Sequence, residues 1–223
     1  MYETRRLVEA ASALSAFLQT RAVPHAFYGD VLISILANQP LAAQISCIVQ
    51  GGAPHPFRLV RDALRSADDF STTSSPWSDR LHVRYHGFIP PIEIEILSAG
   101  EEGPRRLDAN TIMNIRGLPF LSISEYIRAK LKSWAIRQSE PDAREITYLL
   151  NRYWDKVDIN RIPEHDMNDF AAAIPDASRA WSSLQKNTFL YNPKLRPYLL
   201  GASRSSIGVV TCIPSILLVV QQT

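Results

Sequence analysis

The chain has 223 residues, of which 46% are hydrophobic and 21% are charged. This composition is ordinary for a globular protein that buries a sizeable core. The net charge of +2 gives no electrostatic reason to expect nucleic acid or an anionic membrane as a partner. Two cysteines, Cys47 and Cys212, do not make a disulfide framework, and we expect a cytoplasmic protein.

Neither end of the sequence predicts a membrane anchor. The N-terminal residues lead into an amphipathic stretch, so we expect no signal peptide. The apolar run at 207–220 is broken by Thr211 and Pro214, and it falls short of the ~20 residues that a spanning helix needs.

The first elements are a helix, a short strand and a second helix. Apolar residues recur at helical spacing over residues 5–21, and Pro24 ends that helix. A strand at 25–29 then enters a helix at 31–38, through the turn Gly29-Asp30. An alternating strand follows at 43–49.

Further strands complete a predicted sheet. Residues 56–67 form an amphipathic helix, and the polar stretch 66–78 is expected to be a loop. Residues 81–85 and 92–97 alternate between apolar and polar side chains, and they predict a hairpin closed by residues 87–91.

The second half is predicted to be helical. Ser122 and Glu125 have the spacing of a capping box, which predicts a helix through Arg137. Further helices are expected from Ser139 onward and in the segments 163–173 and 176–186. The fold class is therefore α+β, a mixed sheet flanked by helices with a helical C-terminal half. We expect a sheet domain at 1–117, a helical part at 118–200 and an apolar tail at 201–223.

The order of these elements resembles the nucleotidyltransferase fold. That family has a small-residue turn, then a strand carrying Asp-x-Asp, then a third carboxylate on a later strand. Here the turn is Gly29-Asp30, the Asp-x-Asp positions hold Gln44 and Ser46, and Glu95 best matches the third carboxylate. The chain also looks like members of a fungal group of nucleotidyltransferase-like proteins, some encoded among natural-product pathway genes.

The resemblance to small nucleotidyltransferases of toxin–antitoxin systems extends into the second half. Their helix after the third carboxylate strand is similar to residues 118–137, and their downstream Asp-x-x-Asp-Ile motif is matched by residues 142–146. In that family a helix lysine, matched here by Lys130, faces the nucleotide phosphates.

The chain departs from the family at Asp30, at Pro40 and Ala42, and at Gln44 and Ser46. Gln44 and Ser46 are neutral, whereas two-metal phosphoryl transfer needs clustered anionic oxygens around Mg²⁺. Asp30 places a carboxylate where phosphates would dock, although Asp is also a favoured helix cap and we prefer that simpler role. The histidines show no metal-ligand spacing, so we expect neither a metal nor a cofactor.

These residues define a predicted working site. Lys130 or Gln44 would donate a hydrogen bond to a substrate carbonyl, with Glu95 orienting the lysine, and Lys130→Ala and Gln44→Ala should slow product formation far more than they lower the melting temperature. Substrate-binding roles are expected for the following residues: Tyr28, Asp30, Ser46 and Trp134. Trp134 also fits the apolar stripe of its own helix.

Four function classes compete at this stage. An active nucleotidyltransferase lacks its carboxylate pair, and a toxin–antitoxin regulator is disfavoured for the same reason. A catalytically inactive protein that binds a nucleotide or a protein partner is the main alternative. The favoured hypothesis is a cofactor-free cyclase, of the [4+2] or Diels-Alderase type, acting on an apolar natural-product intermediate. Such a reaction needs a shaped pocket and a hydrogen-bond donor.

Overall fold

The computed structural model describes residues 2–38, 45–74, 80–101 and 103–191. The chain divides into a compact unit of residues 1–185 and a second unit of residues 186–223. The predicted apolar tail at 201–223 and the candidate residue Gln44 lie outside the described residues.

The helices are formed by segments with apolar residues at 3.6-residue spacing. They are α1 (Tyr2–Thr20), α2 (Asp30–Ala37), α3 (Pro56–Leu64), α4 (Ile123–Arg137), α5 (Glu140–Arg152), α6 (Glu164–Ala173) and α7 (Pro175–Tyr191), with two 3₁₀ turns, η1 (Trp154–Lys156) and η2 (Ile159–Arg161). None of the helices in the described residues is long and apolar enough to span a membrane.

The strands form one mixed sheet in the order β3-β4-β5-β2-β1-β7-β6. They are β1 (His25–Tyr28), β2 (Ile45–Val49), β3 (Phe70–Ser74), β4 (Leu81–Tyr85), β5 (Ile92–Ser98), β6 (Ile112–Ile115) and β7 (Leu118–Leu121). The predicted pairing of β4 with β5 is confirmed as antiparallel, and β2 and β5 are adjacent and parallel. The expected α+β architecture, a mixed sheet flanked by helices with a helical C-terminal half, is confirmed.

Two parts of the sheet differ from the prediction. The stretch expected to be a loop contains β3, an exposed edge strand that pairs along its length with β4. The sheet also extends past residue 117, because β7 pairs with both β1 and β6. The first four residues assigned to the helical part, 118–121, therefore belong to the sheet.

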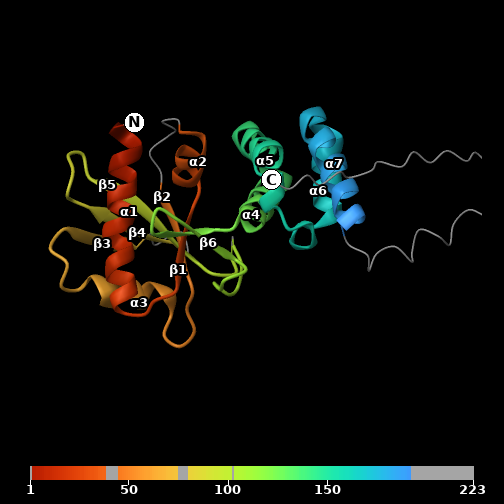
Figure 1. The fold of residues 1–223 in the computed structure, drawn as a ribbon. Helices are drawn as coiled ribbons and strands as arrows, with labels where there is room; N and C mark the ends of the chain where they lie inside the picture. Colours follow the sequence, from red (N-terminus) through yellow and green to blue (C-terminus); the bar gives the residue numbers. More distant parts are fainter. Residues whose placement is uncertain (1, 39–44, 75–79, 102, 192–223) are drawn as a thin grey trace, which may run out of the picture. The chain divides into compact units, whose positions relative to one another are not determined.

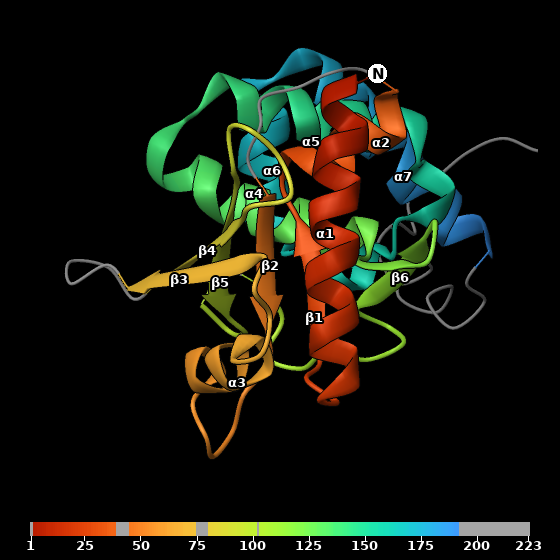
Figure 2. The same ribbon diagram turned by 90° about the vertical axis from the view of Figure 1, so that its left-hand side faces the viewer.

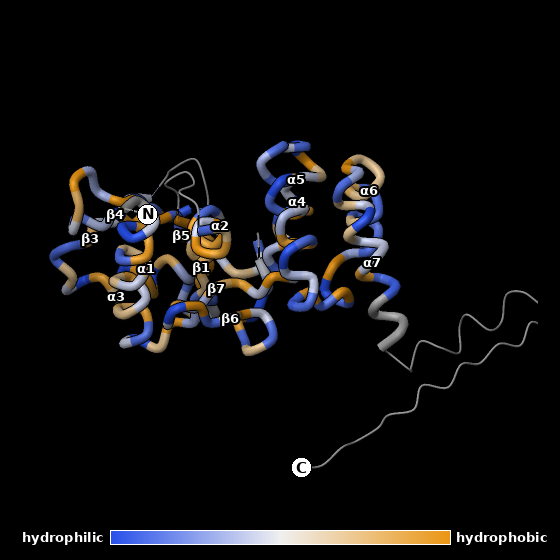
Figure 3. The backbone as a smooth tube through the Cα atoms, turned by 45° about the horizontal axis from the view of Figure 1, so that its top comes forward, coloured by the Kyte–Doolittle hydropathy of each residue, from blue (hydrophilic) through white to orange (hydrophobic). Residues whose placement is uncertain are grey.

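Helix α1 covers one face of the sheet (Figures 1 and 2), where it contacts β1, β5 and β7 as well as α2 and α3. Its inward stripe is fully buried and consists of Leu7, Ala10, Ala11, Leu14 and Leu18. Helix α2 is largely hydrophobic along its length (Figure 3), and its residues 31–35 are buried. Helix α4 packs against α5 and α6.

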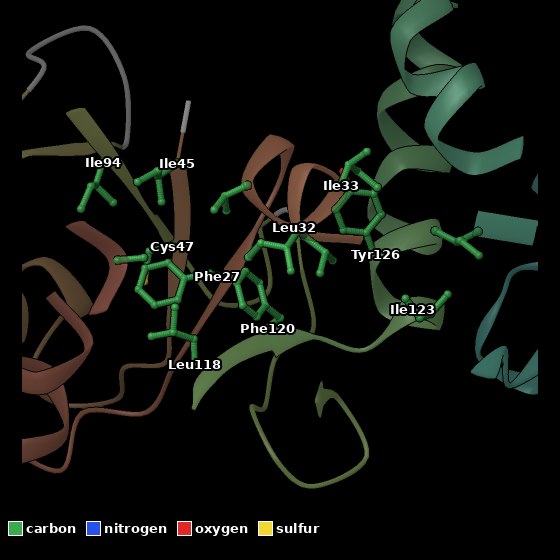
Figure 4. Close-up of a cluster of buried hydrophobic side chains, with 14 of the residues drawn as sticks. Phe27, Leu32, Ile33, Ile45, Cys47, Ile94, Leu118, Phe120, Ile123 and Tyr126 are labelled. Carbon is green, nitrogen blue, oxygen red and sulfur yellow. The ribbon is translucent and has the colours of Figure 1, made fainter. Parts of the chain in front are cut away.

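One hydrophobic core connects the sheet with the first turn of α4. Phe27 of β1 and Phe120 of β7 are fully buried, with ring centroids 6.0 Å apart. Figure 4 shows this cluster, to which α2 contributes Ile33 and α4 contributes Ile123 and Tyr126. The core therefore fixes the start of α4 against the strands that carry the candidate site.

Candidate functional site

Three of the predicted site residues lie side by side across the sheet. In the register of the strands, Tyr28 of β1 is opposite Ser46 of β2, and Ser46 is opposite Glu95 of β5. Residues directly opposite each other in a sheet point to the same face. Ser46 is 7% exposed and Glu95 is 9% exposed, so both polar side chains are buried at this row.

The Glu95 carboxylate is paired with a cation that the sequence analysis did not identify. Arg80, at the residue before β4, forms an ion pair with Glu95 and donates a hydrogen bond to it. The guanidinium offsets the negative charge of this carboxylate. The arginine follows a polar segment, and no local sequence pattern relates it to a glutamate 15 residues further along the chain.

The turn between β1 and α2 brings a second carboxylate to the same end of the sheet. Gly29 is the N-cap of α2 and has a φ of 88°, a conformation that glycine adopts without a Cβ clash. A Cβ added to Gly29 would lie 3.7 Å from the Ser46 Oγ, so the serine side chain points at this turn. Asp30 follows directly as the first residue of the helix, and the cap itself is Gly29, which corrects the capping role preferred for Asp30.

Burial raises the pKa of Asp30, and the nearby carboxylates of Glu145 and Asp142 raise it further, whereas Lys130 lowers it. The Asp30 side chain is half-buried. Its carboxylate therefore lies in a negative local field that the single lysine does not cancel.

Lys130 is held by two carboxylates of the next helix. Its Nζ lies 2.9 Å from the Asp142 Oδ1 and 2.8 Å from the Glu145 Oε2. Burial lowers the pKa of Lys130, but Glu145 and Asp142 outweigh that effect, and the net shift is upward. The expectation that Glu95 orients Lys130 is wrong, because the two residues that bind this ammonium come from α5.

The same network includes two hydroxyl groups. The Tyr126 hydroxyl donates to the Glu145 Oε2 at 2.7 Å, and the Ser133 hydroxyl donates to the Asp142 Oδ2 at 2.9 Å. Burial, followed by the charge of Glu145, raises the pKa of Tyr126 well above its ordinary value. The Tyr126 ring also packs near Tyr28, with centroids 5.8 Å apart, and this contact connects the network with the sheet row.

Trp134 does not join this group of residues. Its ring makes an edge-to-face contact with Phe170 of α6, with centroids 4.9 Å apart, and it is 9% exposed. Trp134 is a core residue between helices, as its position in the apolar stripe also predicted. Its proposed substrate contact is not supported by this position.

Asp142 and Glu145 belong to the motif at residues 142–146, and no role was predicted for either of them from the sequence. Their spacing of three places both on one face of α5, toward Lys130. The motif Asp-x-x-Glu was a signal for this pair. Among the described residues, no group of three or more His, Cys, Asp and Glu side chains has a geometry that would hold a metal ion.

Cavities lined by described residues also lie beside helices α4 and α5. A cavity of about 540 Å³ lies beside α5 and has a largely apolar lining that includes Ala143, Thr147, Tyr148 and Ile174. A second, of about 400 Å³, lies along α4, beside Lys132 and the exposed Ile136.

Comparison with solved structures gives the fold. An antigenic nucleotidyltransferase-like protein from Paracoccidioides brasiliensis is 18% identical, with a TM-score of 0.56 over 78% of this chain and 91% of that chain. A putative nucleotidyltransferase from H. pylori is 14% identical, with a TM-score of 0.48 over 87% of this chain and 84% of that one. The antibiotic-resistance factor ANT(2'')-Ia is 10% identical, with a TM-score of 0.47 over 85% of this chain and 100% of that one.

No family model matches the sequence, and no curated protein matches it. The structural likeness to the Paracoccidioides protein, with the strand order and the Gly29 turn described above, identifies the architecture. The chain has a nucleotidyltransferase-like fold.

Proposed function

We propose that this chain uses a nucleotidyltransferase-like fold to bind a small molecule without a metal ion. One observation carries the proposal. Ser46 lies opposite Glu95 in the sheet, and Arg80 neutralises that glutamate. A row made of a hydroxyl and an ion-paired carboxylate is a poor ligand set for Mg²⁺, which takes its protein ligands from free carboxylates.

The proposal takes Gln44 and Ser46 as the positions of a degenerate Asp-x-Asp motif, as the order of elements in the sequence suggests. In this interpretation the chain retains the third carboxylate, Glu95, and has lost the two that would hold the metal with it. Reduced negative charge is compatible with a largely apolar ligand that a few polar groups orient, as is common for small-molecule sites. A cytoplasmic location is part of this proposal.

Binding without catalysis is the simplest form of this function, and a cofactor-free cyclase is the second candidate. A specific observation favours the cyclase. The Lys130 ammonium has three N–H donors, and Asp142 and Glu145 account for two of them. The third donor would polarise a substrate carbonyl, which is the single polar contribution that a [4+2] cyclisation needs.

A thermal-shift comparison tests the binding proposal. Mg-ATP and a library of apolar polyketides and terpenoids would be added to the wild-type chain, to Ser46→Val and to Thr73→Val. Thr73 belongs to the same row, at the exposed edge strand β3, and is the matched control. We expect a library compound to raise the melting temperature of the wild type and of Thr73→Val but not of Ser46→Val. A stabilisation by Mg-ATP that exceeds that of every library compound would contradict the proposal.

The cyclase candidate has its own test once a compound of the library binds. Lys130→Arg keeps the positive charge but changes the geometry of the spare N–H group. We expect it to slow product formation by ~10²–10³-fold, the usual effect of losing one preorganised donor. Lys132→Arg, on the exposed face of α4, is the control and should react at the wild-type rate. Full activity of Lys130→Arg would exclude the cyclase role of this lysine.

A further inference from the structure

At the turn between β1 and α2, two polar side chains have no hydrogen-bond partner among the described residues: Asp30 of the turn and Ser46 of the neighbouring strand β2. We call this group of four residues the Gly29 site: Tyr28, Gly29, Asp30 and Ser46. The Ser46 hydroxyl points at Gly29, and the residue is 7% exposed. Within the part of the chain that the structure describes, its Oγ makes no hydrogen bond. This oxygen is not one of the fully buried unpartnered atoms of the described residues, so it is open to a hydrogen bond from a ligand.

The carboxylate of Asp30 is the second unsatisfied group. Across the described residues it forms neither an ion pair nor a hydrogen bond. The nearest cation, Lys130, is already held by Asp142 and Glu145. Arg137 also lies 4.0 Å from the Asp142 Oδ2, so three carboxylates share two cations, which leaves an excess of one negative charge around this turn.

The geometry points to a ligand with a primary ammonium group, and we propose that the Gly29 site binds it. The ammonium would donate to the Asp30 carboxylate and to the Ser46 Oγ, which are both acceptors. Tyr28 is the register partner of Ser46, and its ring packs against Tyr126. An aromatic ring attracts a cation, so we expect this ring to contribute to the binding. An apolar body attached to the ammonium would then lie against this ring.

The same charges select against anions. A phosphate or carboxylate at the Gly29 turn would face Asp30 directly and would lie in the field of Glu145 and Asp142. Like charges repel each other, and the repulsion is stronger where water is partly excluded. This inference rests on the proposed function, and it names the chemical class of the ligand as an amine with an apolar body.

Three probes of nearly equal shape test the charge preference. They are 2-phenylethylamine, which is a cation at neutral pH, 2-phenylethanol, which is neutral, and phenylacetate, which is an anion. Each would be titrated into the full chain by calorimetry without metal, and backbone NMR shifts would locate the binding. We expect the amine to bind at least about tenfold more tightly than the alcohol, a difference of ~1.4 kcal/mol, and the anion to bind more weakly than the alcohol.

Two isosteric variants assign the effect. Asp30→Asn removes the charge from the Gly29 site, and we expect it to abolish the preference for the amine over the alcohol. Asp68→Asn makes the same chemical change at an exposed aspartate outside the site and should leave the preference intact. A melting temperature of Asp30→Asn equal to or higher than that of the wild type would show that the variant keeps the folded state.

Several outcomes would overturn the inference. They are equal affinity of the amine and the alcohol, an unchanged preference in Asp30→Asn, the absence of amine binding at millimolar concentration, and NMR shifts confined to the α5 cavity around Thr147 and Tyr148. Tighter binding of the alcohol at the Gly29 site would overturn the charge preference and leave the metal-independent site intact. A separate Mg²⁺-dependent binding of ATP would contradict the proposed function itself.

Discussion

Ser46 of β2 is the register partner of Glu95 of β5, and the glutamate is ion-paired with Arg80. This relationship places a hydroxyl and a neutralised carboxylate on adjacent parallel strands. A site that binds Mg²⁺ for phosphoryl transfer presents free negative charges to the ion. The pairing is the structural reason for proposing metal-independent binding at this site.

Removal of the Lys130 charge should destabilise the protein strongly. The side chains of Lys130, Asp142 and Glu145 are 13%, 7% and 14% exposed. Lys130→Met would leave Glu145 without its cation and Asp142 with only the exposed Arg137, 4.0 Å away. Breaking a buried ion pair in this way typically costs about 3–5 kcal/mol in the free energy of unfolding. Urea denaturation measures it, with the exposed Lys132→Met as the control, for which we expect a change within about 0.5 kcal/mol.

The same destabilisation is expected for Lys130→Ala. A slower reaction in that variant could then come from loss of folded protein rather than from loss of the hydrogen-bond donor. Lys130→Arg keeps the charge and is therefore the better probe of the reaction. If Lys130→Met proved as stable as the wild type, the role of this lysine as a structural cation would be wrong.

Asp30→Asn should raise the stability of the protein at neutral pH. An aspartate whose pKa is raised on folding binds protons more readily in the folded state, so its contribution to stability falls as pH rises from the unfolded pKa of 3.8 through the folded value. Above that window the full penalty of the charged form is present, and Asn does not carry it. Urea denaturation at pH 7 should show the gain, and the same comparison near pH 3 should show a smaller one.

A lower stability of Asp30→Asn at pH 7 would mean that the carboxylate has a partner that stabilises it. Asp68→Asn controls for the change in net charge. A gain in stability together with a loss of ligand binding is the pattern expected of a residue that is retained for function.

His25 should make the protein less stable as the pH falls. It is 4% exposed, and burial lowers its pKa below the ordinary value of 6.5, although a backbone hydrogen bond to Val23 opposes the shift. The Nδ1 lies 2.9 Å from the Val23 carbonyl oxygen, which only accepts, so Nδ1 carries the proton and Nε2 accepts from the Ser15 hydroxyl. Below pH 6.5 the unfolded chain binds the proton more readily, so the free energy of unfolding should fall.

The comparison of His25→Gln with the wild type between pH 7.5 and pH 5 measures this effect, on a scale of about 1.4 kcal/mol for each unit of pKa shift. We expect the variant to lose part of the pH dependence. His165→Gln changes a fully exposed histidine whose pKa is raised, chiefly by its backbone hydrogen bond, and it should keep the decline on acidification. An unchanged pH slope in His25→Gln would contradict the assignment.

The sequence predicted those parts of the fold that have a clear periodicity. The strands containing Ser46 and Glu95 alternate in sequence, and the structure pairs them as the parallel neighbours β2 and β5. Strand β3 was missed because its residues are polar and exposed at the sheet edge, where no buried face imposes alternation. The β6–β7 hairpin closes through a two-residue turn of Arg116 and Gly117, which both have positive φ. The glycine was the sequence signal that could have predicted this hairpin.

The candidate site was only partly predictable for a different reason. The positions of Tyr28, Asp30 and Ser46 follow from local elements and their order along the chain. The partners of the charged residues depend on tertiary packing, so Arg80 was not assigned to Glu95 and Lys130 was assigned to the wrong carboxylate. Periodicity predicts on which face of a helix or strand a side chain lies, but it does not predict which other helix packs against that face.

The most direct test of the central claim is a calorimetric titration of Mg-ATP and Mn²⁺ into the wild-type chain and into Gln44→Asp/Ser46→Asp. We expect no measurable binding by the wild type and weak metal binding by the double variant. Adding Arg80→Gln should increase that affinity by about tenfold, ~1.4 kcal/mol, because the cation paired with Glu95 is removed. The control is Ser71→Asp/Thr73→Asp, which adds two charges at the same spacing on the edge strand β3 and should bind no metal. Binding of Mg-ATP by the wild type in the low micromolar range would contradict the account.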